Sequence, residues 1–65
     1  MDKETVEIFL GKFVQLVKRT SDNKTFKLYG EIQKVTSDSI IIYTDRLGAV
    51  LLEDIVSIRE AEKKQ

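Results

Sequence analysis

The chain has 65 residues, with 11 basic and 11 acidic side chains, so its formal net charge is zero. It has no cysteine and no histidine, which excludes disulfides, thiolate sites and histidine-based metal sites. A protein held to nucleic acid mainly by phosphate contacts usually carries a basic excess, and this chain as a whole has none.

The length predicts one domain over residues 1–65, with a core that is marginal unless a partner chain completes it. The sequence shows no signal peptide and no apolar run of membrane-spanning length. We therefore expect a cytoplasmic protein that does not contact a membrane.

The N-terminal segment has the pattern of a short amphipathic helix, expected at about residues 2–10. Val6, Phe9 and Leu10 are spaced three and four residues apart, which places them on one helix face. Asp2 is suited to cap this helix and Gly11 to end it. A helix of this length is stable only when it docks on the rest of the chain.

The segment that follows predicts a hairpin of two strands, at 12–20 and 25–35, joined by turn residues at 21–24. In the second strand apolar and polar residues alternate, so one face is buried and the other is wet. Gly30 interrupts the alternation on the buried face. A missing side chain there predicts a sharp bend or a close approach of another backbone segment.

Residues 36–39 are typical of a turn. Residues 40–44 are β-branched or aromatic throughout and predict a third strand. We expect this strand to be covered on both faces, with Tyr43 buried. Residues 45–48 predict a further turn, with Gly48 at positive φ. A fourth strand is expected at 49–52 and a fifth at 55–59, with an interruption at 53–54 and a charged tail at 60–65. Such short strands at close spacing predict a small barrel.

The pattern resembles the Sm-like superfamily, which includes LSm proteins and bacterial Hfq. Leu28-Tyr29-Gly30-Glu31-Ile32 is similar to the apolar-x-Gly-x-apolar core of the first Sm motif, and 38–42 to the close of that motif. Residues 51–56 occupy the place of the second motif. The resemblance implies an all-β small barrel of the Sm-like and SH3-like kind, with five strongly bent antiparallel strands after a short N-terminal α-helix.

The resemblance also implies assembly. Sm-like subunits pair the fourth strand of one copy with the fifth strand of the next, which here implies a homo-oligomeric ring of about five to seven subunits. The residues themselves favour such pairing, because exposed apolar edge strands pair with other chains unless they are covered. The alternative is a monomeric barrel whose last strands close on the first. The predicted subunit-interface residues are Val50, Leu51, Leu52, Ile55, Val56 and Ile58.

The family binds single-stranded RNA, and four residues are candidates for that role here: Tyr29, Lys27, Lys34 and Asp38. Tyr29 lies on the wet face beside Lys27, where it can stack on a base, although cross-strand packing or a subunit contact is an alternative. Asp38 lies in the loop that reads uracil in the family. No asparagine or aromatic residue accompanies it, and the basic residues of the second motif are missing. The resemblance therefore implies a degenerate uridine pocket.

The remaining aromatic residues Phe9, Phe13 and Phe26 are expected in the core, and Asp45–Arg46 and Arg59–Glu60 are expected to form surface ion pairs. The absence of histidine, cysteine and nucleophile motifs predicts no enzyme, no catalytic residue, no cofactor, no metal and no small-molecule substrate. Two functions stay open. One is an Sm-like ring that binds single-stranded RNA as a chaperone or scaffold, and the other is an SH3-like module that binds proteins without RNA.

Overall fold

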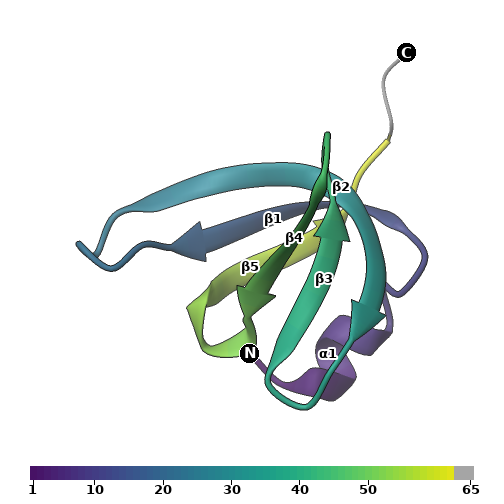
Figure 1. The fold of residues 1–65 in the computed structure, drawn as a ribbon, viewed down its shortest axis with the longest axis horizontal. Coiled ribbons are helices and arrows are strands. Elements are labelled where there is room, and N and C mark those ends of the chain that lie inside the picture. The colour runs from purple at the N-terminus through teal and green to yellow at the C-terminus, as the bar shows by residue number, and fades with distance from the viewer. Residues whose placement is uncertain (63–65) are drawn as a thin grey trace.

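The computed structural model describes residues 1–62. A short helix precedes five strands in the predicted order (Figure 1). The predicted interruption at 53–54 is confirmed as one turn of 3₁₀-helix, and residues 63–65 of the predicted charged tail lie outside the described residues. The elements are α1 (Lys3–Glu7), β1 (Phe13–Arg19), β2 (Thr25–Val35), β3 (Ser39–Tyr43), β4 (Leu47–Leu51), η1 (Leu52–Asp54) and β5 (Ile55–Glu60).

The strands form one antiparallel sheet in the order β4-β3-β2-β1-β5. The long strand β2 curves through the molecule and joins its two halves (Figure 1). Its first part, up to Glu31, pairs with β1, and its second part, Glu31 to Val35, pairs with β3. Strands β4 and β5 lie at the two edges and are not hydrogen-bonded to each other, so the sheet does not close on itself.

The predicted special role of Gly30 is confirmed. A Cβ atom at this position would overlap the backbone carbonyl of Tyr43 on β3. Only glycine leaves room for β3 to pass this close to β2, at the point where β2 changes partners. The close approach therefore allows the two halves of the sheet to fold toward each other.

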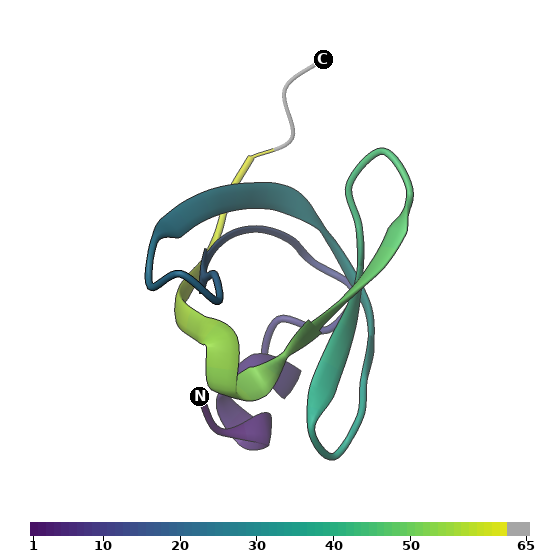
Figure 2. The same ribbon diagram turned by 60° about the vertical axis from the view of Figure 1, so that its left-hand side comes forward.

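The core is apolar, and no polar or charged side chain is buried among the described residues. Helix α1 contributes one of the buried side chains, Val6, and Figures 1 and 2 show α1 at the end of the sheet where η1 and the β2–β3 turn lie. The buried residues are Val6, Val14, Leu16, Ile32, Ile40, Ile42, Val50, Leu52 and Ile55.

The helix is shorter than predicted because the chain leaves it at Glu7. The amide of Phe9 donates to the Val6 carbonyl (2.9 Å) and that of Leu10 to the Glu7 carbonyl (3.1 Å), so the segment continues as tighter turns. Gly11 then takes a positive φ of 80°, and its amide donates to the Ile32 carbonyl (2.9 Å). This hydrogen bond fixes the entry into β1.

Three local predictions are wrong. Tyr43 is 48% exposed because its side chain lies on the outer face of the sheet, away from the core, and Phe26 is 45% exposed because it lies near the free end of the β1–β2 hairpin. Gly48 lies within β4 opposite Ile42 and does not have a positive φ. The predicted turn at 45–48 is therefore shorter, and β4 begins at Leu47.

Candidate nucleic-acid interface

The outer face of β1, β2 and β5 carries a row of three polar side chains. Gln15 on β1 lies opposite Tyr29 on β2 and, on its other side, opposite Arg59 on β5. The Tyr29 hydroxyl donates to Gln15 Oε1 (3.4 Å), and Arg59 donates to the same oxygen through Nε (3.3 Å) and Nη2 (2.8 Å). One amide oxygen thus orients an aromatic ring and a guanidinium group on the same face.

The Tyr29 side chain is 50% exposed, as the sequence predicts, and its ring is accessible to a ligand. Lys27 is exposed two residues earlier in β2, so strand alternation places it on the same face. Arg59 uses only part of its guanidinium in the contact with Gln15, and its other N–H groups remain as donors. An exposed ring with cations on the same face is the combination that single-strand binders use for bases and phosphates.

A groove of about 720 Å³ borders this row. Glu60 on its rim lies 3.6 Å from the Lys12 ammonium, so a neighbouring cation partly offsets its charge. Phe13, predicted in the core, is only half-buried and lies on the groove wall. The lining residues are Phe13, Gln15, Tyr29, Arg59, Glu60, Ala61 and Glu62.

Aromatic side chains extend this face toward β3. Glu31 pairs with Phe13 on one side and with Tyr43 on the other, which forms a second row beside that of Gln15. A smaller hollow of about 100 Å³ lies there, lined by Phe13, Glu31, Gln33, Tyr43 and Thr44. The outer face therefore presents aromatic rings from three adjacent strands.

The four residues predicted to bind RNA are not brought together. Tyr29 and Lys27 share the outer face of β2 near its start, whereas Lys34 pairs with Ile41 near the end of the strand. Asp38 lies in the β2–β3 turn and lines a different pocket, which shares no residue with the groove beside Tyr29. The structure thus supports two of the four as parts of one surface.

Sequence reasoning missed Gln15 and Arg59. Alternation in β1 is a signal that places Gln15 on a wet face, but its partners follow only from the strand register. The predicted Arg59–Glu60 ion pair is wrong, because these side chains point to opposite faces and bind Gln15 and Lys12 instead. The predicted Asp45–Arg46 pair is confirmed at 3.8 Å between Oδ1 and Nε.

The predicted subunit-interface residues divide into two groups. Val50, Leu52 and Ile55 belong to the core of the chain itself, so their side chains are not available to a neighbour. Leu51 on β4 and Val56 on β5 are each 45% exposed, and Ile58 is partly buried. Exposed apolar side chains are therefore present on both free edge strands.

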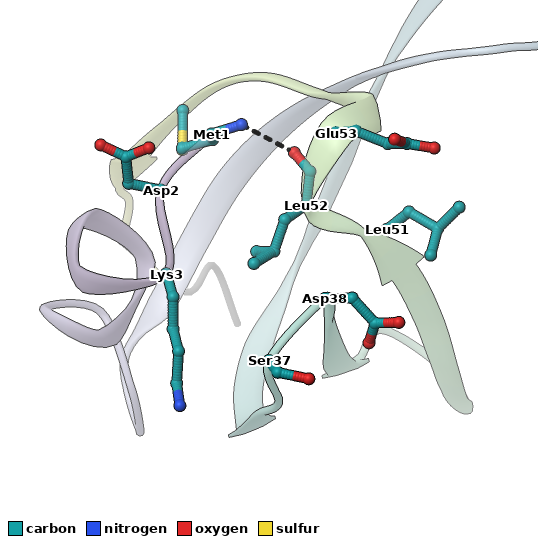
Figure 3. Close-up of a pocket in the computed structure, with 8 residues that line it drawn as sticks. All are labelled: Met1, Asp2, Lys3, Ser37, Asp38, Leu51, Leu52 and Glu53. Carbon is teal, nitrogen blue, oxygen red and sulfur yellow. Dashed lines mark hydrogen bonds between the residues drawn. The ribbon is translucent and has the colours of Figure 1, made fainter.

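The pocket that contains Asp38 lies between α1, η1 and the β2–β3 turn (Figure 3). The Met1 ammonium donates to the Leu52 carbonyl across it (2.9 Å). In Figure 3 the Asp2 carboxylate points away from those of Asp38 and Glu53, and within residues 1–62 no group of three or more acidic side chains is positioned to hold a metal ion.

In the part of the chain that the structure describes, no helix has the length and apolar character needed to cross a bilayer. Comparison with models of known protein families, with curated protein sequences and with solved structures finds no match to this chain. The outer face and the sheet edges are therefore the features of this chain that bear on its function.

Proposed function

We propose that this chain is an Sm-like small barrel that assembles into a homo-oligomeric ring and binds single-stranded RNA on the outer face of β1, β2 and β5, as an RNA chaperone or scaffold. The observation that carries the proposal is the row of Tyr29, Gln15 and Arg59, with Lys27 beside it.

The row favours a single-stranded ligand because it offers a flat ring and separate cations on an open surface. A base stacked on Tyr29 contributes on the order of 1–3 kcal/mol and requires no particular sequence. Lys27, two residues along β2, and Arg59, across the sheet beyond Gln15, lie on the same face and can contact phosphates near that base. Gln15 accepts a hydrogen bond from Arg59 at 2.8 Å, which reduces the entropy that this side chain loses when RNA binds, and a longer one from Tyr29 at 3.4 Å.

The ring is supported by the two free sheet edges. Strand β4 exposes Leu47 and Leu51 and strand β5 exposes Val56, and neither edge has a partner strand within residues 1–62. Pairing β4 of one copy with β5 of the next covers both edges in every subunit of a closed ring. The unclosed sheet is then completed between subunits.

A protein-binding module is the second candidate, and the groove beside Tyr29 favours it. Two aromatic side chains, Phe13 and Tyr29, line this groove, and Glu60 and Glu62 bring negative charge to it. Acidic groups repel RNA phosphates, whereas an aromatic groove with an acidic rim suits a basic or proline-rich peptide. In this case the outer face binds peptide and not RNA.

A titration of the intact assembly with oligo-A and oligo-U at low salt separates the two candidates. Tyr29→Ala is expected to weaken RNA binding by about 5- to 150-fold, because the stacking surface is lost. Tyr29→Phe keeps the ring and is expected to retain most of the affinity.

Phe26→Ala is the matched control, since Phe26 is an exposed aromatic on the opposite face of β2. Absence of RNA binding to the wild type at low salt would retire the RNA proposal for these ligands. An equal loss in Tyr29→Ala and Phe26→Ala would show that the outer face is not the site.

A further inference from the structure

The β1–β2 hairpin extends away from the rest of the molecule (Figure 1). Strand β5 pairs with β1 only as far as Lys18, and β3 pairs with β2 only from Glu31 onward. The end of the hairpin is consequently a two-stranded ribbon, and its side chains are exposed from Arg19 to Lys27 apart from the half-buried Thr20. We call residues 18–27 the arm.

The arm is strongly basic although the chain is neutral. It carries Lys18, Arg19, Lys24 and Lys27 but only one acidic residue, Asp22, an excess of three positive charges. The rest of the chain has the matching acidic excess, so the zero net charge results from two oppositely charged regions. Lys24 lies 4.0 Å from Asp22, and this contact is the only ion pair in the arm.

The positive charges surround the arm. Arg19 lies opposite Thr25 and Lys27 opposite Val17, and these four residues share the outer face. Lys18 is on the inner face, where its ammonium lies 5.4 Å from the centre of the Phe26 ring. Lys24 is exposed where the turn rejoins β2. A ligand that touches one face meets only part of this charge.

We propose that the arm docks into a groove of duplex DNA and contacts phosphates of both strands. A groove presents phosphates on two opposed walls, which matches a ribbon that carries cations on both faces. The major groove of B-form DNA, about 12 Å wide, admits a two-stranded β-ribbon. The cations of the arm lie on both faces and in the turn, which suits phosphates on two opposed walls better than one row of base edges, so the contact is led by phosphates and largely independent of sequence.

The proposal is tested with a double-stranded DNA of about two helical turns and with either of its single strands. Arg19→Gln/Lys24→Gln removes two exposed arm cations, and Lys12→Gln/Arg46→Gln removes two exposed cations elsewhere, so both variants have the same net charge. Arg19→Gln/Lys24→Gln is expected to bind the duplex about tenfold or more weakly than the wild type. The slope of log affinity against log salt concentration is expected to become shallower by nearly two units in this variant. Lys12→Gln/Arg46→Gln is expected to keep the affinity and the slope of the wild type.

Absence of duplex binding by the wild type at low salt, or an equal loss of affinity in the two double variants, would overturn the proposal. It would also be overturned if single-stranded DNA bound as tightly as the duplex and lost as much affinity when Arg19 and Lys24 were replaced. Binding of polyglutamate that weakens in the same way on that replacement would overturn it too. Circular dichroism of each variant checks that the fold is kept. Tyr29→Ala is expected to retain duplex binding, so this test is independent of the RNA proposal.

Discussion

At Gly30 the backbone of β2 passes so close to the Tyr43 carbonyl that a side chain does not fit. Gln15 also has a role that depends on its side chain, because its single amide oxygen accepts hydrogen bonds from Tyr29 and Arg59. The first residue permits the bend of the sheet, and the second orders the side chains of its outer face. The sequence predicts the first role from the interrupted alternation at Gly30, whereas the second depends on the strand register.

Gly30→Ala is expected to destabilise the protein by about 3 kcal/mol, because the backbone of β2 or β3 must shift to admit the methyl group. Gly48→Ala is the matched control: a Cβ atom there meets nothing within 4 Å. Urea unfolding of both variants measures the difference. A Gly30→Ala protein as stable as Gly48→Ala would show that the close approach is not required.

At the scale of elements, α1 is held by one buried side chain. Val6 is fully buried, whereas Ile8, just after the helix, is exposed. Five residues are too few for a helix to persist alone, so docking of Val6 on the sheet stabilises it. The sequence predicts this helix from its apolar stripe but overestimates its length, because the Gly11 amide binds the Ile32 carbonyl and turns the chain early.

Val6→Ala is expected to lower the free energy of unfolding by about 2 kcal/mol through lost burial and a cavity. Ile8→Ala is expected to change it by less than about 0.5 kcal/mol, since the side chain is exposed. Thermal or urea denaturation checks both variants. Equal effects would mean that α1 is not anchored through Val6.

At the scale of the whole molecule, the sheet ends in β4 and β5, each with one edge that has no partner strand within residues 1–62, and a 65-residue chain has a small core of its own. Burial of nine apolar side chains leaves Leu47, Leu51 and Val56 exposed near these edges. Self-association through β4 and β5 is the simplest way for the sheet to satisfy its edges.

Light scattering is expected to find an oligomer at micromolar concentration, and Leu51→Lys/Val56→Lys is expected to yield folded monomers, because lysine on an edge strand opposes pairing. Ile8→Lys/Leu10→Lys places the same charges on exposed apolar residues away from the edges and is expected to leave the oligomer intact. A monomeric wild type, or dissociation only in the Ile8/Leu10 variant, would contradict edge pairing.

The local pattern of the sequence determines the order of the elements, the wet face of β2 and the special place of Gly30, because alternation and turn residues act over a few neighbouring positions. Tertiary structure alone decides that Tyr29 and Arg59 meet at Gln15. Tyr29 is 14 positions and Arg59 is 44 positions away from Gln15 in the chain, and the strand register brings them together. It also decides that Tyr43 and Phe26 are exposed, because burial depends on the face and the part of the sheet on which a side chain lies and not on its own apolar character.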